Sequence, residues 1–218
     1  MTDNLSKRIF TSFILFAVLL ICIFLNKHSF FILVIIASVI SFFELNNLVN
    51  KIWKKNKLLK NSINIICFLY LFFFTYSAYE LYNIKLNLII FIILVCIFSD
   101  IGGYIIGKSI GGKKLTKISP NKTISGSIGS FTFSLIPIII FYLKYGFSKN
   151  TDLIFLVIFC LFTSLTCQLG DLFISYFKRK AKVKNTGTIL PGHGGLLDRI
   201  DGIIFVIPSV FIVDKIFF

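Results

Sequence analysis

Long uncharged apolar blocks are the feature that most constrains this chain, and they cover residues 9–25, 29–43 and 86–99. The 218 residues are 56% hydrophobic and 15% charged, whereas a typical soluble domain has about 25% charged residues. A transmembrane helix needs about 20 mainly apolar residues, and helices satisfy the backbone polar groups in lipid. The blocks therefore exclude a soluble globular domain, a disordered chain and a disulfide-stapled secreted domain. They predict an all-α polytopic membrane protein.

We expect about seven transmembrane helices, at residues 9–26, 29–49, 62–82, 86–107, 127–145, 152–177 and 202–218. The first block follows Lys7 and Arg8, as in a signal peptide, but no small-residue cleavage pattern follows it, so we interpret it as a retained span. The short gap at Lys27–His28 predicts a helical hairpin. The end of the sixth span is ambiguous because Gly170 and Asp171 interrupt its apolar run.

Basic residues are distributed unevenly between the two sides of this arrangement. Of the 23 Lys and Arg residues, 18 fall in the N-terminus and in loops 50–61, 108–126 and 178–201, and five fall on the other side. Cytoplasmic loops of membrane proteins carry excess Lys and Arg. The N-terminus and the glycine- and lysine-rich loops are therefore predicted to face the cytoplasm, with the protein in a bacterial cytoplasmic (inner) membrane. Topology explains most of the formal charge of +14, and we expect no nucleic acid partner.

The acidic residues divide into two groups. Glu44 and Glu80 lie near span ends, where we expect an interfacial position. A carboxylate in mid-membrane costs about 2.5–3.5 kcal/mol and should face protein, water or a partner. Four others gather near the glycine-rich loops, namely Asp100, Asp171, Asp198 and Asp201. The five cysteines lie in apolar blocks without metal-ligand spacing and are interpreted as small buried hydrophobic residues.

The stretch 170–202 combines cations, glycines and carboxylates. A basic run contains Lys178, Arg179, Lys182 and Lys184. The tripeptide His193-Gly194-Gly195 offers backbone N–H groups that suit phosphate oxygens. Asp198 and Asp201 would share one face of a helix. Hard oxygen ligands near cations suit Mg²⁺ that carries a polyphosphate, whereas a simple basic loop would explain the lysines but not the acid pair.

A second glycine-rich stretch, residues 99–129, holds seven Gly, five Lys and five Ser. Glycine-rich backbone beside lysine is also suited to binding phosphate. No Walker A spacing occurs here. A flexible loop explains this stretch equally well when it is taken alone.

The motifs in these stretches resemble those of the phosphatidate cytidylyltransferase (CDP-diacylglycerol synthase) family. The long match runs from Ser175 through Lys178-Arg179, Lys184, Pro191 and His193-Gly194-Gly195 to Asp198-Arg199-Ile200-Asp201. Shorter matches are Asp100-x-x-Gly103-Tyr104-x-x-Gly107-Lys108, Ser119-Pro120-Asn121-Lys122-Thr123-x-x-Gly126 and Gly170-Asp171-Leu172-x-x-Ser175. The similarity covers about residues 95–218. The chain departs from the family pattern at Ser125, Ile174 and Asn185, where the family often has acids, and we expect fewer N-terminal spans than the family has.

The resemblance implies transfer of a cytidylyl group from CTP to phosphatidate in phospholipid biosynthesis, with Mg²⁺ and a second cation as an open alternative. The implied metal ligands are Asp171 and Asp198, with Asp201 as a third ligand or a support of the other two. The other implied catalytic residues are Lys178, Arg179, Lys184, His193 and Arg199. The implied nucleotide- and phosphate-binding residues are Asp100, Ser119, Lys122, Thr123, Gly194 and Gly195. For His193, a phosphate hydrogen bond and a turn contact remain equal alternatives, ahead of proton transfer.

This interpretation divides one integral bundle into N-terminal transmembrane spans, residues 1–85, and a C-terminal catalytic region, residues 86–218. The expected partners are CTP, phosphatidate and membrane lipid, and a homodimer is a further expectation. Two alternatives stay open. One is a CTP-dependent polyprenol kinase, which would use the same nucleotide with another acceptor. The other is an ion-coupled transporter, which would need broken helices or an inverted repeat near mid-membrane.

Overall fold

The computed structural model describes residues 2–84, 86–145, 152–192 and 194–217. Within these ranges the regular structure is helical and the only β pairings are two isolated bridges, Lys114 with Thr123 and Leu190 with Gly194. The helices are α1 (Thr2–Leu25), α2 (Lys27–Ile52), α3 (Lys57–Ile84), α4 (Leu86–Ile110), α5 (Ile124–Phe133), α6 (Ile136–Tyr145), α7 (Leu153–Lys180), α8 (Leu197–Ile200) and α9 (Ile203–Phe217). The prediction of an all-α polytopic membrane protein is confirmed.

Five helical segments are long and apolar enough to cross a membrane: α2, α3, α4, α7 and the segment Ile124–Lys144 that joins α5 to α6. The first and seventh predicted spans also form helices, but their apolar segments are shorter. They comprise residues 10–25 of α1 and the 15 residues of α9. A count of seven crossings stays a prediction.

One predicted detail of the helices is wrong, and one that the sequence left ambiguous is resolved. The first turn lies at Asn26 and not at Lys27–His28, because the Asn26 side chain accepts a hydrogen bond from the Ser29 backbone N–H at 2.8 Å and so caps α2. Helix α7 is not interrupted at Gly170–Asp171 and continues to Lys180. A Cβ at Gly170 would lie 2.8 Å from the Asp201 carbonyl oxygen, so this glycine permits close packing of α7 against the segment before α9.

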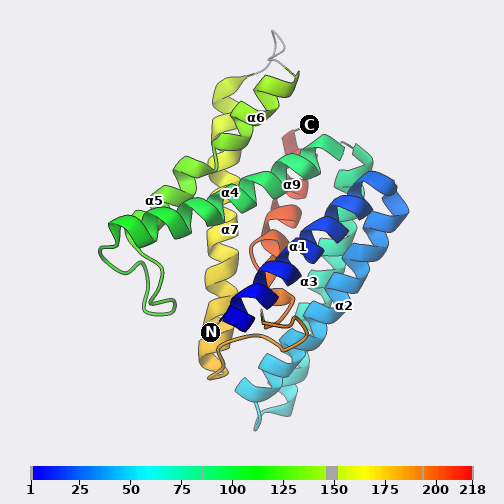
Figure 1. Ribbon diagram of the computed structural model, residues 1–218. Coiled ribbons are helices and arrows are strands. Elements are labelled where there is room, and N and C mark those ends of the chain that lie inside the picture. Colours follow the sequence, from blue (N-terminus) through cyan, green and yellow to red (C-terminus); the bar gives the residue numbers. More distant parts are fainter. Residues whose placement is uncertain (1, 85, 146–151, 193, 218) are drawn as a thin grey trace.

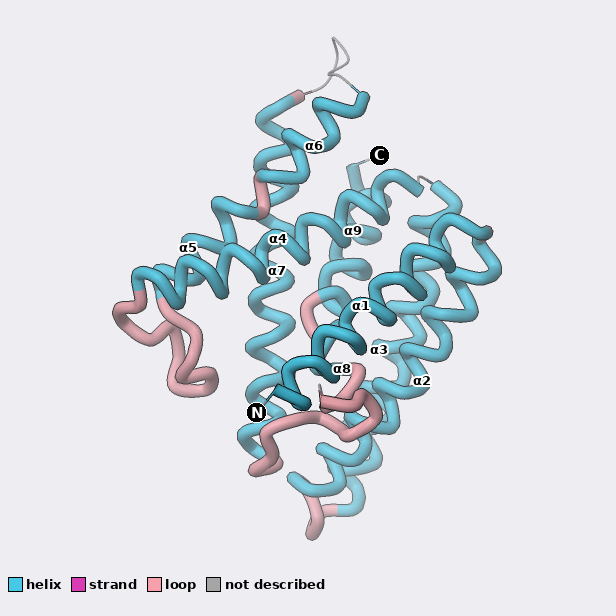
Figure 2. Tube along the Cα trace, in the orientation of Figure 1, coloured by secondary structure: helices cyan, strands magenta, loops and turns pink. Residues whose placement is uncertain are grey.

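The connections segregate to two ends of the bundle (Figures 1 and 2). The long loops 53–56, 111–123 and 181–196 lie with the start of α1 on the lower side of the view. The α1–α2 turn, the end of α3, the start of α4 and the ends of α6 and α9 lie on the upper side. The loops that carry the excess of basic residues therefore share one end, as the alternating spans predict.

The hydrophobic core contains side chains from both sides of residue 85. One cluster of buried side chains joins Phe30, Val34 and Phe74 from the N-terminal helices to Ile174 and Ile207 from the C-terminal helices. Figure 1 shows α9 between α7 and the pair α2–α3. The two parts thus share one cluster of buried side chains, and the division at residue 85 stays a prediction.

Helices α4 and α5 pack through glycines. A Cβ at Gly129 would lie 2.7 Å from the Gly102 carbonyl oxygen, and a Cβ at Gly126 would lie 2.8 Å from the Gly103 carbonyl oxygen. Small residues let helix backbones approach closely inside membranes. The pair is fixed to α7 because the Ser127 hydroxyl donates a hydrogen bond to Gln168 Oε1 at 2.6 Å. The loop before α5 is thereby held beside α7.

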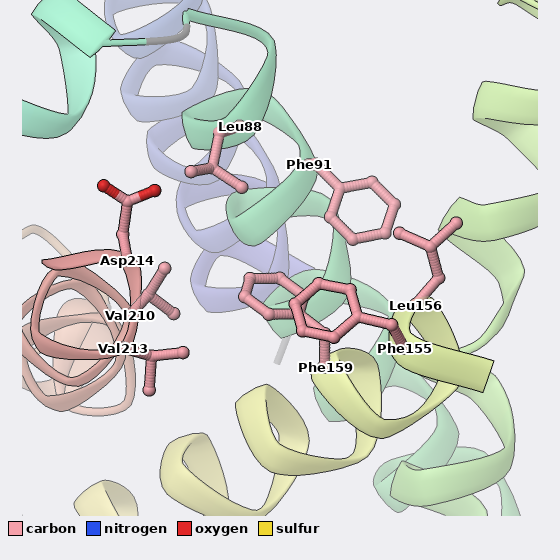
Figure 3. A pocket seen from close by; sticks show the side chains of 8 residues that line it. All are labelled: Leu88, Phe91, Phe155, Leu156, Phe159, Val210, Val213 and Asp214. Carbon is pink, nitrogen blue, oxygen red and sulfur yellow. The ribbon is translucent and has the colours of Figure 1, made fainter. Parts of the chain in front are cut away.

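An apolar cleft opens between α4, α7 and α9 (Figure 3). Its lining residues are Leu88 and Phe91 of α4, Phe155, Leu156 and Phe159 of α7, and Val210, Val213 and Asp214 of α9. Phe155 and Phe159 lie in the first turns of α7, whereas the predicted cationic residues of that helix lie in its last turn. The cleft therefore lies at the end of the bundle away from the glycine-rich loops and contains none of the predicted site residues.

Candidate active site

The first glycine-rich stretch meets the second through an ion pair between Lys122 and Asp171. Lys122 lies in the loop before α5 and Asp171 lies in α7, and their side chains are 27% and 31% exposed. The Ser175 hydroxyl, one turn later in α7, donates a hydrogen bond to Asp171 Oδ1 at 3.2 Å. Two sequence segments that were predicted independently to handle phosphate are therefore in direct contact.

A second ion pair, between Lys178 and Asp198, is more deeply buried. The ammonium nitrogen lies 2.7 Å from Asp198 Oδ1, and the side chains are 12% and 8% exposed. Asp198 Oδ2 accepts hydrogen bonds from the backbone N–H groups of Thr186 at 2.8 Å and Gly195 at 3.2 Å, and lies 3.1 Å from the Thr186 hydroxyl. Asp198 thus joins the end of α7 to loop 181–196.

Three carboxylates approach one another where α4, α7 and the α8–α9 turn meet. Burial raises the pKa of Asp201 well above its usual value, the negative charges of Asp171 and Asp100 raise it further, and the positive charge of Lys178 opposes them. The Gly202 backbone N–H donates to Asp201 Oδ1 at 3.0 Å. A bound cation would relieve the mutual repulsion among such neighbouring carboxylates.

The oxygen donors of this cluster fit a hard divalent cation. Mg²⁺ is usually held by one or two carboxylates together with water and substrate phosphates, and Asp171 and Asp201 provide such a pair. Within the described ranges, however, no three His, Cys, Asp or Glu side chains are grouped as a metal site. The predicted triad is therefore not assembled, because Asp198 is directed toward Lys178 and the loop. Metal binding by Asp171, Asp198 and Asp201 stays a prediction.

The predicted glycine pair has partners inside its own loop. The Gly194 N–H donates to the Leu190 carbonyl oxygen at 3.1 Å, and the Gly195 N–H donates to Asp198. Gly194 has a φ of 92°, and a Cβ there would lie 2.8 Å from Asn185 Cγ, so only glycine suits this position. The interpretation of these N–H groups as open to phosphate is not reproduced. The structure uses both glycines to close the loop, and phosphate binding by them stays a prediction.

The remaining predicted residues surround the two ion pairs. The Arg179 Nε–H donates to the Ile118 carbonyl oxygen at 3.4 Å, which ties α7 to the loop before α5. Thr123 caps α5 by accepting a hydrogen bond from the Gly126 N–H at 3.0 Å, and the Ser119 N–H donates to the Thr116 hydroxyl at 3.2 Å. Lys184 and Arg199 are exposed. The prediction for His193 lies outside the described residues.

Sequence reasoning missed Glu44. The sequence assigned it only a position near a span end, whereas its side chain is buried inside the protein, with 2% exposure, and accepts three hydrogen bonds from residues of the stretch 170–202. The sequence feature that could have drawn attention to Glu44 is a carboxylate within an apolar span, with no cation close to it in sequence. Glu80, which has the same signal, is only partly buried, so the sequence could not distinguish the two.

Comparison with known proteins gives a family match and several similar relatives. The model described as "Cytidylyltransferase family" matches residues 53–217. A phosphatidate cytidylyltransferase of Rickettsia bellii is 45% identical over 123 residues, which are 54% of this chain and 53% of the relative. Proteins of the same name from Staphylococcus saprophyticus and Bacillus subtilis are each 44% identical, over 131 and 130 residues. These segments are 60% and 59% of this chain, and 50% and 48% of the relatives.

The chain spans about half the length of these curated relatives. The matched family segment, in contrast, covers most of this chain and includes both ion pairs, the carboxylate cluster and the two glycine-rich stretches. The chain therefore belongs to the cytidylyltransferase family.

Proposed function

We propose that the protein is a membrane enzyme of phospholipid biosynthesis that transfers a cytidylyl group from CTP to phosphatidate, with CDP-diacylglycerol and pyrophosphate as products. The names of the relatives and the motif resemblance support this reaction. The observation that supports it most directly is the contact between the two glycine-rich stretches at Lys122 and Asp171. That contact gathers cations and carboxylates at one end of a lipid-embedded bundle, where a polyanionic nucleotide and a lipid phosphate could meet.

The reaction requires charge neutralisation more than proton transfer. A phosphate oxygen of phosphatidate forms a bond to the α-phosphorus of CTP, the bond from that phosphorus to the bridging oxygen breaks, and pyrophosphate leaves with the bonding electrons. The attacking phosphate is already ionised at neutral pH, so no strong general base is needed. Lys122 and Lys178 would lower the repulsion between the two anions, and this electrostatic effect is the main source of acceleration in such transfers.

Asp171 and Asp201 would hold Mg²⁺, with Asp198 as a further candidate ligand and a second cation as an open alternative. The bound ion would neutralise nucleotide phosphate charge. The Ser175 hydroxyl, which donates to Asp171, would keep that carboxylate oriented. The proposed nucleotide contacts are Ser119, Lys122, Thr123, Arg179 and Lys184, with Gly194 and Gly195 as the backbone candidates.

The glycine-rich loops and the N-terminus are proposed to face the cytoplasm, where CTP is found, in a bacterial inner membrane. The acyl chains of phosphatidate would remain in the bilayer between helices. The family match does not favour the polyprenol kinase or the transporter. A homodimer and the lack of a nucleic acid partner remain predictions.

An assay of label transfer tests this function. The purified protein in detergent is incubated with phosphatidate, with a polyprenol or with no acceptor. The CTP is labelled at the α-phosphate, which cytidylyl transfer would move to the lipid, or in a parallel sample at the γ-phosphate, which a kinase would move, and the organic phase is then extracted. We expect labelled lipid only with phosphatidate, and loss of the product after EDTA treatment with recovery on addition of Mg²⁺. Labelled lipid in the sample without acceptor would contradict the reaction. Label transfer that EDTA leaves unchanged would contradict its metal dependence.

Asp171→Asn and Asp152→Asn form a matched pair for the same assay. Asp171→Asn should lower kcat/KM by about 100-fold or more because it removes charge from the carboxylate cluster. Asp152 caps α7 at its other end by accepting a hydrogen bond from the Ile154 N–H at 2.9 Å. Asparagine caps helices as well as aspartate does, so Asp152→Asn should retain full activity.

A further inference from the structure

Glu44 of α2 is bonded to a loop that lies far from it in sequence. Its Oε1 accepts a hydrogen bond from the Leu196 N–H at 3.0 Å, and its Oε2 accepts hydrogen bonds from the Leu197 N–H at 3.0 Å and the Thr186 hydroxyl at 2.7 Å. Thr186 and Leu197 are 142 and 153 residues away along the chain. A side chain of the N-terminal region thereby holds the segment that contains the family signature.

The loop is closed around this carboxylate. A Cβ added at Gly187 would lie 2.5 Å from Glu44 Oε1, and one added at Gly195 would lie 2.4 Å from Glu44 Oε2. Real Cβ atoms do not approach oxygen so closely, so glycine at both positions is what allows the loop to reach Glu44. Gly187 and Gly195 therefore pack directly against the Glu44 carboxylate.

Thr186 links this contact to the second ion pair. Its hydroxyl lies 2.7 Å from Glu44 Oε2 and 3.1 Å from Asp198 Oδ2, and its backbone N–H donates to Asp198 Oδ2 at 2.8 Å. A hydroxyl has one hydrogen and donates it to one acceptor at a time, and the shorter distance favours Glu44. Glu44 and Asp198 are therefore both bonded to the same loop. Asp198 also forms the ion pair with Lys178, so the loop position affects that pair.

The energetics of Glu44 favour a functional role over simple packing. Within the described residues it forms hydrogen bonds but no ion pair. Burial of a carboxylate without a paired cation is costly, and an apolar residue of similar volume would pack at lower cost. What the carboxylate provides in return is a fixed loop geometry, because each of its two oxygens accepts from a different backbone N–H group.

We propose that Glu44 is a positioning residue of the active site. It fixes residues 186–197 against α2 and so sets the position of Asp198 and Lys178 toward the nucleotide phosphates. This role rests on the proposed cytidylyl transfer. Glu44 lies before residue 53, where the family match begins, so the site is completed by a residue from outside the matched segment.

Hydrogen–deuterium exchange tests the contact without any assay of activity. In Glu44→Gln the shape is kept, but an NH₂ group must face one of the N–H donors of the loop. We expect exchange in the peptide that contains residues 186–197 to accelerate by about tenfold or more, with other helices unchanged. Glu80→Gln is the matched control, since it removes a carboxylate from the same half of the chain without touching the loop, and its exchange should equal that of the unmodified protein.

Steady-state kinetics test the positioning role. Glu44→Gln should lower kcat by about tenfold or more and change KM for CTP by less than about threefold, because CTP also contacts residues that Glu44 does not touch. Thr186→Val should act in the same direction. The kcat of the double variant should lie within about threefold of the kcat of the slower single variant, since both changes break the same link.

Three results would overturn the inference: unchanged exchange in the loop of Glu44→Gln, faster exchange throughout the protein, or single-variant losses that multiply in the double variant. If Glu44→Gln does not fold, loop exchange and kcat of Thr186→Val decide in its place. If the unmodified protein transfers no cytidylyl group, the proposed function fails, while the exchange experiment still decides whether Glu44 holds the loop.

Discussion

The two Lys–Asp pairs of the site offer a matched test of how burial sets the contribution of an ion pair to stability. In the pair Lys178–Asp198 the side chains are 12% and 8% exposed, and in the pair Lys122–Asp171 they are 27% and 31% exposed. The perturbation is the same in both: lysine is replaced by methionine, which has a similar length and a similar helix propensity. The two sites differ in that Lys178 lies in the last turn of α7 and Lys122 in the loop before α5, and in the burial of the aspartate that remains.

The structure gives different expectations for the two variants. Removal of one partner from a buried ion pair costs about 3–5 kcal/mol. Asp198 keeps the Thr186 and Gly195 donors, so we expect the lower end, about 3 kcal/mol, for Lys178→Met. For a chain of this length, 1 kcal/mol shifts Tm by about 2–4 °C, so the loss corresponds to about 6–12 °C. Lys122→Met breaks the less buried pair, for which we take the value of surface ion pairs, about 0–1 kcal/mol, corresponding to about 0–4 °C.

Thermal unfolding of both purified variants in the same detergent measures the difference. The double variant Lys178→Met with Asp198→Asn should regain at least half of the lost Tm, because the uncompensated charge is gone while an oxygen acceptor remains for the loop. Equal shifts in the two single variants, or a shift below about 2 °C for Lys178→Met, would refute the assignment of Asp198 as a buried charge that depends on Lys178.

Three further predictions concern packing, topology and a departure from the family pattern. Gly129→Ala should lower Tm by several degrees because its Cβ would lie 2.5 Å from Ile106 Cβ, whereas Gly111→Asn should have little effect, since nothing lies within 4 Å and Asn tolerates its φ of 64°. In a background without native cysteines, Lys113→Cys and Lys182→Cys should resist impermeant thiol reagents in intact cells, and labelling from outside would overturn the proposed orientation. Asn185→Asp should change kcat/KM by less than about tenfold, because Asn185 is an exposed residue that packs over Gly194; a gain of about 100-fold would instead make a carboxylate at this position catalytic.

The helix content and the grouping of the basic loops at one end of the bundle followed from the sequence because both depend on local properties. The apolar run of α4, residues 86–99, has no charged residue, and lipid leaves such a run few alternatives to a helix. The separation of basic loops from short turns likewise needs only the order of spans. The sequence also singled out the two glycine-rich stretches, because cations, carboxylates and glycine near a membrane surface suit phosphate, and the structure shows that they meet at Lys122 and Asp171.

Tertiary structure alone decided which of these groups meet and what each one does. Asp198 and Asp201 are three residues apart, yet Asp198 is bonded to Lys178 and loop 181–196, whereas Asp201 lies in the electric field of Asp171 and Asp100. Glu44 and Glu80 look alike in sequence, but among the contacts of the described residues it is Glu44, and not Glu80, that is bonded to the loop. The physical reason is that burial and hydrogen bonding of a side chain depend on the surface packed against it. For Glu44 that surface comes from residues more than 140 positions away, where hydropathy and motif spacing carry no information about contact.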